Sequence, residues 1–302
     1  MIDVRKLRLL RELHARGTVG AVAEALAYSP SGVSQQLAQL QREAGVPLTE
    51  RVGRRLRLTD AGLRLVEHAD ALLAQLELAE AELQEAAGVV RGRVRMGALQ
   101  TPMLHLVPEA LALLRERHPA VRVEILEAEA EESLPAVALG ELEMAVAEEY
   151  DEAPRSLGTG LARRILARDE VVVVLPAAHP LAASGGAVDL ADLAGEVWVT
   201  PRAETDFAAM HASACRRLGG FEPDIQHRAN DVQILATLVA TTGAVALLPT
   251  LGRPEGHPGV AVRPVAHAEL GRTISAFHRA SGARSPALRA LVAALEETGR
   301  MS

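Results

Sequence analysis

The first 58 residues carry apolar positions three and four apart, the spacing of helices that bury one face. The stripe Leu7, Leu10 and Leu13 predicts a first helix, and Gly17 is suited to end it. Thr18 then stands where a second helix needs an N-cap. The pattern therefore predicts a small helical domain over residues 1–58.

A third helix is expected from Pro30 to about residue 44, because Ser29 is a favoured N-cap before a proline and Gly45 is a favoured end. Its apolar side would hold Val33, Leu37, Leu40 and Ala44. Its opposite side would hold Ser31, Ser34, Gln35, Ala38 and Arg42. Short uncharged groups let a helix enter the DNA major groove, and glutamine can pair with the edge of adenine. This pattern predicts the second helix of a helix-turn-helix, and a solvated surface helix is the alternative.

A basic turn follows this helix. Its arginines, grouped around Gly53, are Arg51, Arg54, Arg55 and Arg57. Between two helices, such a turn would form a wing that reaches DNA phosphates or the minor groove. A merely solvated turn is the alternative, but the position beside the third helix favours contact with DNA.

Residues 59–88 predict one long helix with a seven-residue repeat. The two apolar rows, offset by three, are Gly62, Ala69, Leu76 and Leu83, and Leu65, Leu72, Ala79 and Ala86. This is the seam of a coiled coil. Roughly 28 helical residues span about 42 Å, which is too long for a helix packed within one small domain. We expect a dimerising helix; a long surface helix on a single core is the alternative.

From residue 93 onward strands alternate with helices, which predicts an α/β fold after an all-α N-terminal part. The apolar run Val171–Leu175 is typical of a parallel strand buried on both faces. Expected strands cover 93–99, 121–126, 143–148, 170–176, 197–200, 244–249 and 272–279. Expected helices cover 102–118, the segment from about 204, 230–243 and 285–297.

Composition adds a charge asymmetry. The 302 residues carry a net charge of -7, but residues 1–65 hold eleven Lys and Arg against six Asp and Glu. A basic end on an acidic chain indicates contact with nucleic acid. The single cysteine excludes an internal disulfide framework, and we find no signal peptide and no membrane segment in the sequence. We therefore expect a cytoplasmic protein that does not contact the membrane.

The segment AVAEALAYSPSGVSQQLAQLQREAGVPLTERVGRRLRLTDAG resembles the N-terminal signature of LysR-type transcriptional regulators. The resemblance covers about residues 3–90, and the later sections fit the family in order and length. It implies a winged helix-turn-helix at 1–58, a linker helix at 59–88 and an effector domain with the periplasmic-binding-protein fold. It also implies a homodimer or homotetramer on a promoter palindrome in double-stranded DNA, a small-molecule effector and contact with RNA polymerase.

Residue by residue, the resemblance implies DNA contacts on the third helix at Ser29, Pro30, Ser31, Ser34, Gln35 and Gln36. In the wing it implies Arg54 and Arg55. Two positions depart from the family pattern. Gly32 replaces a common alanine, at a cost of about 1 kcal/mol of helix stability. Thr49 replaces the usual phenylalanine, so we expect a less apolar and more mobile wing anchor.

The resemblance also implies two α/β subdomains around the effector, one from 93–166 plus 265–302 and the other from 169–262. We expect the chain to cross between them near Ala167–Asp169 and Val262–Val265. Ligands in open α/β sheets bind where strands end and helices begin. The candidate effector contacts are Gln100, Thr101, Glu127, Ala128, Glu129, Thr200, Asn230 and Asp231. For Thr101, Thr200 and Asp231, simple helix capping is an equal alternative.

The loop EAEAEE at 127–132 departs from the small residues common in the family. If these carboxylates face the cleft, they favour a cationic effector such as a basic amino acid, and disfavour an anion. Solvated surface charges are the alternative.

Two other classes of protein fit the sequence less well. An enzyme is disfavoured because the chain has no HExxH, P-loop, GxSxG or CxxC motif, so we expect no catalytic residue, no metal site and no cofactor. A solute-binding protein without DNA activity would need neither the polar helix face at 29–44 nor the heptads.

Overall fold

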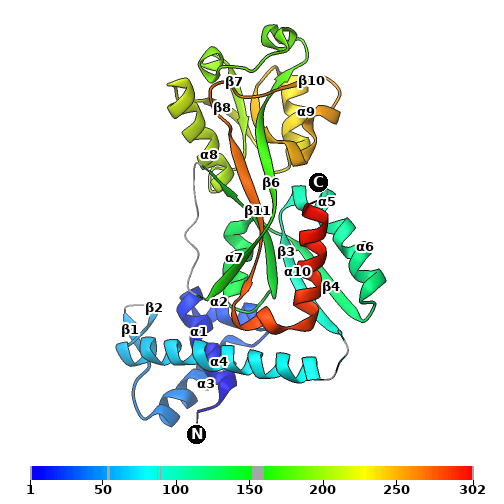
Figure 1. Cartoon of the computed structure of the whole chain (residues 1–302). Helices are drawn as coiled ribbons and strands as arrows, with labels where there is room; N and C mark the ends of the chain where they lie inside the picture. The colour runs from blue at the N-terminus through cyan, green and yellow to red at the C-terminus, as the bar shows by residue number, and fades with distance from the viewer. Residues whose placement is uncertain (1, 53–54, 87, 89, 152–159, 301–302) are drawn as a thin grey trace. The chain divides into compact units, whose positions relative to one another are not determined.

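The computed structural model describes residues 2–52, 55–86, 88, 90–151 and 160–300. The chain divides into two compact units, Met1–Val89 and Val90–Ser302. In Figure 1 the first unit consists of helices and a small hairpin, and the second contains long strands with helices beside them. The predicted fold class, a helical N-terminal part followed by an α/β part, is confirmed. Among the helices of the described ranges, none is both long and apolar enough to cross a membrane.

The N-terminal unit begins and ends its helices at the signals found in the sequence. Thr18 and Ser29 each accept a backbone N–H from three residues further on. Gly17 and Gly45 adopt the left-handed conformation after the first and third helices. The elements are α1 (Val4–Arg16), α2 (Val19–Ala25), α3 (Pro30–Ala44), β1 (Thr49–Val52), β2 (Arg55–Leu58) and α4 (Asp60–Ala86).

A leucine-rich core fixes the orientation of these helices. Its fully buried members include Leu7, Leu10, Leu13, Val22, Val33, Leu37 and Leu40. Burying each leucine contributes about 1.5–3 kcal/mol. Because α3 buries its apolar stripe here, its polar side is turned to solvent, as the sequence predicts.

The heptad positions of α4 divide into buried and exposed ones. Gly62 and Ala69 are buried in the core of the N-terminal unit, so these two positions do not belong to a dimer seam. A Cβ atom at Gly62 would lie 2.2 Å from the Leu48 carbonyl oxygen, which explains the glycine. Further along, Leu76 and Leu83 are 47% and 72% exposed. The exposed part of the predicted seam consists of Leu72, Leu76, Ala79, Leu83 and Ala86.

The C-terminal unit is organised by a mixed sheet. Its strand order is β10-β6-β11-β5-β3-β4, and β9 also pairs with β6. The strands are β3 (Gly92–Ala98), β4 (Val121–Glu127), β5 (Met144–Tyr150), β6 (Leu161–Pro176), β9 (Ala246–Pro249), β10 (Val260–Arg263) and β11 (Gly271–Arg279). A separate parallel pair is formed by β7 (Val197–Thr200) and β8 (Asp224–Arg228). The helices are α5 (Gln100–His105), α6 (Val107–Arg117), α7 (Ala130–Ala138), α8 (Asp206–Ala214), α9 (Val232–Thr242) and α10 (Pro286–Gly299).

The strand at Val171–Leu175 is buried as predicted, but its direction was predicted wrongly. This part of β6 pairs antiparallel with both β9 and β10. An unbroken apolar run indicates burial on both faces and carries no information about the direction of the neighbouring strands. Of the sheet pairs, β3 runs parallel to β4 and β5.

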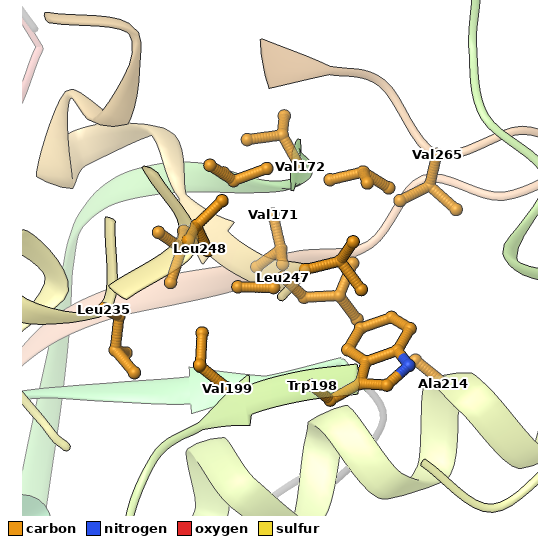
Figure 2. Close-up of a cluster of buried hydrophobic side chains, with 14 of the residues drawn as sticks. Val171, Val172, Trp198, Val199, Ala214, Leu235, Leu247, Leu248 and Val265 are labelled. Atoms are coloured by element: carbon orange, nitrogen blue, oxygen red, sulfur yellow. The ribbon is translucent and has the colours of Figure 1, made fainter. Parts of the chain in front are cut away.

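Two large hydrophobic cores divide the C-terminal unit. One core contains Met96, Ile274 and Leu291. The other surrounds Trp198, whose indole Figure 2 shows among valines and leucines that include Val171, Leu247 and Val265. From these cores we infer two lobes: lobe 1 comprises residues 90–151, 160–169 and 271–300, and lobe 2 comprises residues 170–270.

Strands β6 and β11 carry the chain between the lobes, and Figure 1 shows both running through the middle of the unit. The first half of β6 pairs with β11, and its second half pairs with β9 and β10. The first crossing thus follows Asp169, at the end of the predicted segment. The second crossing was placed too early at Val262–Val265, because Val265 and Leu270 both belong to the lobe 2 core. The sequence reading had missed β10, which keeps the chain in lobe 2.

Other differences have local causes. The helix expected over 102–118 is interrupted at Leu106, because Pro108 near the start of α6 has no N–H to continue the hydrogen bonding of α5. Strand β8 and the first half of β6 were not predicted, since their polar and charged residues obscure the alternation.

The turn of the helix-turn-helix contains a strained residue. Ala27 follows α2 with a φ of 54°, in the left-handed region that glycine adopts without strain. The adjacent Tyr28 N–H donates to the Ala23 carbonyl at 2.8 Å, which closes the turn and directs the chain into α3. The left-handed conformation costs a residue with a Cβ about 1–2 kcal/mol.

We expect Ala27→Gly to stabilise the helix-turn-helix by about 0.5–1 kcal/mol, since relief of strain exceeds the entropic cost of glycine. Amide hydrogen exchange of α2 and α3 in the full chain measures the change. Ala25→Gly, inside α2, is the matched control and should reduce protection. A loss of protection in both variants would contradict the strain at Ala27.

Candidate DNA-binding and effector-binding sites

The outward face of α3 presents the residues predicted to contact DNA. Ser29, Pro30, Ser31, Ser34, Gln35 and Gln36 are all exposed. The serine hydroxyls are held locally: Ser34 donates to the Pro30 carbonyl at 2.9 Å, and Ser31 lies 3.2 Å from Ser29. A Cβ at Gly32 would lie 3.0 Å from the Ser29 Oγ, so alanine there would crowd the cap. From Ser29 to Gln36 the exposed side chains are therefore small or amide-bearing and uncharged, which suits close approach to the major groove.

The basic turn is an antiparallel hairpin, the wing of a winged helix. Arg51 pairs with Leu56 and Glu50 pairs with Arg57 across β1 and β2. Arg51 and Arg57 are exposed. Arg54 and the side chain of Arg55 lie outside the described part of the chain. Exposed guanidinium groups on such a hairpin can contact phosphates.

The root of the wing is held by a residue that the sequence reading missed. The Gln41 Oε1 accepts hydrogen bonds from the Leu48 N–H at 2.9 Å and from the Thr49 N–H at 3.0 Å. It also accepts the Thr49 hydroxyl at 3.2 Å. Thr49 stands where the family usually has a phenylalanine, and its contacts with Gln41 are polar. The start of the wing is therefore attached to α3 by hydrogen bonds at the position where we expect greater mobility from the sequence. Gln41 had no distinguishing signal in the sequence, because glutamines recur throughout α3.

A narrow pocket lies between the lobes, with about 320 Å³ of empty space that includes open solvent. From lobe 1 its lining includes Leu99, Gln100, Thr101, Glu129, Glu148, Tyr150 and Arg272. From lobe 2 it includes Thr205, Phe207, Asn230 and Val232. Most of these residues stand where a strand ends and a helix begins, the position expected for a ligand site in an α/β sheet.

Four of the eight predicted effector contacts line this pocket: Gln100, Thr101, Glu129 and Asn230. The other four do not. Glu127 is exposed and Ala128 is buried. Thr200 is buried and accepts a hydrogen bond from Arg228 at 3.0 Å. Asp231 caps α9 by accepting the N–H groups of the second and third helical residues, which is the capping alternative.

Side chains of lobe 1 accept hydrogen bonds from lobe 2 across the pocket. The Gln100 Oε1 accepts the Val232 N–H at 3.0 Å. The Glu129 carboxylate accepts the Asn230 amide at 2.9 Å. Glu131 accepts the backbone N–H of the first residue of α8 at 3.2 Å. The two lobes are thus joined directly by hydrogen bonds at and beside the pocket.

Arg272 lines the pocket and forms a buried ion pair with Asp169, which lies outside the lining; the sequence reading missed this pair. Arg272, 1% exposed, donates through Nε to the Asp169 Oδ2 at 2.8 Å, and its Nη2 lies 2.7 Å from the same oxygen in an ion pair. Its Nη2 also donates to the Thr101 hydroxyl at 2.6 Å. Burial alone would lower the pKa of Arg272, but Tyr150, Asp169 and Glu148 outweigh burial and raise it. The available signal was the arginine at the start of the predicted strand RTISAFHR.

Two carboxylates give the pocket its acidic character. Burial, together with the nearby Glu148 carboxylate, raises the pKa of Glu129 to about 7, although the hydrogen bond from Asn230 opposes the shift. Glu148 is itself 4% exposed. An aromatic wall completes the site, since Tyr150 stacks on Phe207 with ring centroids 5.4 Å apart. The pocket is therefore lined by charged groups and by aromatic rings.

The N-terminal unit has the architecture of a winged helix-turn-helix, a class of DNA-binding domain, and the C-terminal unit is a two-lobed α/β unit with a pocket between its lobes. The family comparison agrees. Residues 4–63 match the bacterial regulatory helix-turn-helix protein, lysR family, and residues 87–300 match the LysR substrate binding domain. The chain belongs to the LysR family of transcriptional regulators, as its sequence resemblance implied.

Individual relatives support the same assignment. A probable RuBisCO transcriptional regulator of Cyanophora paradoxa is 30% identical over 180 residues, which are 60% of this chain and 55% of that protein. The chain thus spans about half the length of this and similar curated relatives. The transcriptional dual regulator GltC of Bacillus subtilis is 25% identical over 90% of this chain and 89% of its own length.

Solved structures share the fold. Full-length OxyR from Pseudomonas aeruginosa, in a variant with one cysteine replaced by aspartate, superposes with a TM-score of 0.69 at 23% identity, covering 98% of this chain and 95% of that one. Full-length CbnR in complex with its target DNA gives a TM-score of 0.56 at 21% identity, covering 98% and 100%.

We expect Gln41→Leu to release the root of the wing, because the Leu48 and Thr49 amides both lose their acceptor, and an unsatisfied buried donor costs about 1–3 kcal/mol. Hydrogen exchange at these two amides should accelerate strongly. Thr49→Val, which removes only the hydroxyl bond, should leave them largely protected. Equal exchange in both variants and the wild type would contradict the role of Gln41.

Proposed function

We propose that the protein binds promoter DNA sequence-specifically and regulates transcription in response to a small molecule in the interlobe pocket. The observation that carries this proposal is the exposed row of serines and glutamines on α3, followed in the chain by an arginine-bearing hairpin. The buried stripe on the other side of α3 fixes that face outward. Membership of a family of transcriptional regulators supports the proposal that the protein is a regulator and is not an enzyme. We propose that it acts in the cytoplasm.

We further propose that the protein works as a homodimer or homotetramer on a palindromic site. The exposed apolar row of α4, with Leu72, Leu76 and Leu83 spaced as in a heptad, supports pairing with a second copy of the chain. A two-fold pair presents two copies of α3, and a palindrome presents two equivalent half-sites. RNA polymerase, a partner implied by the family resemblance, would contact the protein bound at the promoter.

The effector we propose is cationic, such as a basic amino acid or an amine. The support is the balance of charge: Glu129 and Glu148 line the pocket, whereas the charge of Arg272 is paired with Asp169. Of the acidic loop at 127–132, Glu129 faces the pocket and Glu127 lies on the surface. Titration calorimetry with L-arginine, L-lysine and benzoate tests this proposal, which is rejected if benzoate alone binds.

DNA binding should depend on the wing through its charge. We expect Arg51→Ala plus Arg57→Ala to weaken binding to all sequences and to reduce the slope of log K against log salt by about 2, because two phosphate contacts are lost. A gel shift on the DNA upstream of the gene and of its divergent neighbour, repeated at several salt concentrations, measures the slope.

Matched control variants distinguish the recognition of bases from the charge-dependent contact with phosphates. Arg115→Ala plus Arg122→Ala removes two exposed arginines of the C-terminal unit and should leave the slope unchanged. Gln35→Ala should weaken the preferred site by about 1–3 kcal/mol and spare nonspecific binding. If the wild-type chain shifts no DNA, the solute-binding alternative gains support.

Binding of a cation should strengthen as the pH rises from 6 to 8. Glu129, with its pKa of about 7, loses its proton over this range, and only the carboxylate attracts a cation. The ionised fraction rises from about one tenth to nine tenths, so affinity should increase by up to about tenfold. Calorimetry with pentane-1,5-diamine, whose amines stay charged throughout, measures the trend. Glu129→Gln should bind the diamine more weakly and without this dependence; a pH-dependent gain retained in that variant would exclude Glu129 as its source.

A further inference from the structure

Arg272 is the one basic residue among the described residues that line the pocket. It is almost fully buried, and its donors have assigned partners. Nε and Nη2 reach Asp169, Nη2 also reaches the Thr101 hydroxyl, and Nη1 lies 3.5 Å from the Tyr150 hydroxyl. A ligand in the pocket therefore meets a guanidinium that is already hydrogen-bonded and charge-compensated.

Asp169 does not line the pocket, yet its position is fixed from two sides. Its Oδ2 accepts from Arg272. Its Oδ1 accepts the Thr250 hydroxyl and the Leu251 N–H, both at 2.8 Å. These last two donors belong to lobe 2, whereas Arg272 is the second residue of β11 in lobe 1. The carboxylate is therefore held against the guanidinium by contacts that a ligand does not touch.

The charge seen from the pocket follows from this arrangement. A positive and a negative group less than 3 Å apart act at the distance of a ligand as a weak dipole, because their opposite fields largely cancel. Glu129 and Glu148 are then the remaining charged groups of the lining, and Glu129 contributes its full charge only well above its pKa of about 7. Without the Asp169 charge, Arg272 would offset one of these carboxylates, and the charge of the site would rise by one unit.

We propose that Asp169 is a specificity-determining residue of the effector site, which masks the charge of Arg272 so that the pocket selects cations over anions. Asp169 acts through Arg272 and is a positioning residue. This assignment rests on the proposed function of the pocket as a cationic effector site. It identifies a residue outside the pocket lining that sets the class of ligand.

The test uses two probes with the same five-carbon chain and opposite charges, pentane-1,5-diamine and glutarate. Titration calorimetry on the full chain gives the ratio of their affinities. In Asp169→Asn the amide oxygen can still accept from Thr250 and Leu251, but the negative charge is gone. We expect the ratio of diamine to glutarate affinity to fall at least tenfold from its wild-type value. A smaller fall overturns the proposal.

Asp169→Asn leaves a buried cation without its counter-ion and could misfold, so a second variant serves as the control. Asp169→Asn combined with Arg272→Gln removes both charges and leaves the net charge of the pair unchanged. We expect this double variant to keep the wild-type ratio within about threefold, which a merely structural role for Asp169 does not predict. If the double variant changes the ratio by more than about threefold from the wild-type value, the proposal is overturned, whether or not the single variant folds.

The outcomes separate this inference from the proposed function. If the wild type prefers glutarate or binds neither probe, the cationic effector and the masking role both fail, while DNA binding is decided independently by the gel shift. If the wild type prefers the diamine and Asp169→Asn keeps that preference unchanged, only the role of Asp169 fails.

Discussion

The contact between Asp169 and Arg272 is the constraint around which the C-terminal unit is arranged. It joins β6 and β11 where both strands pass between the lobes, and Thr101, Thr250 and Leu251 converge on the same two side chains. Breaking one partner of a buried pair costs about 3–5 kcal/mol, whereas an apolar replacement of the whole pair is often neutral. The pair therefore contributes more to registry and to the charge of the pocket than to net stability.

The N-terminal unit solves a different problem, which is to present a polar helix face rigidly. The stripe Val33, Leu37 and Leu40 determines which way α3 faces, but it does not position the hairpin that follows. Gln41 provides that link, because one carbonyl oxygen on α3 holds the first residues of the wing. The helix face that includes Gln35 and the hairpin are thus connected through side chains of a single helix, so their relative geometry is set within one small unit.

Local signals in the sequence were sufficient for much of this fold. Thr18 and Ser29 cap helices because their side chains act on neighbouring N–H groups, and such effects are visible within a few residues. Gly62 was misread as a seam position because the heptad rule does not distinguish a partner chain from the chain's own core. The pair of Asp169 and Arg272 was out of reach, since 103 positions separate the two residues and neither belongs to a motif. Half of the predicted effector contacts line the pocket, because pockets in α/β folds lie where strands end, but only tertiary contacts show which side chains are used for capping.

The pocket also explains how a ligand could act on both lobes at once. Glu129 and Glu131 of lobe 1 accept donors that belong to lobe 2, from the Asn230 amide and the Asp206 N–H. A cation that pairs with Glu129 competes with the Asn230 amide for the same carboxylate, so ligand binding and the interlobe contact are not independent. A ligand changes an equilibrium only as far as it binds the two states differently. Because the proposed partner of the ligand, Glu129, also forms an interlobe contact, a cation that displaces the Asn230 amide would alter the free energy that holds the lobes together, and such a difference is what control by an effector requires.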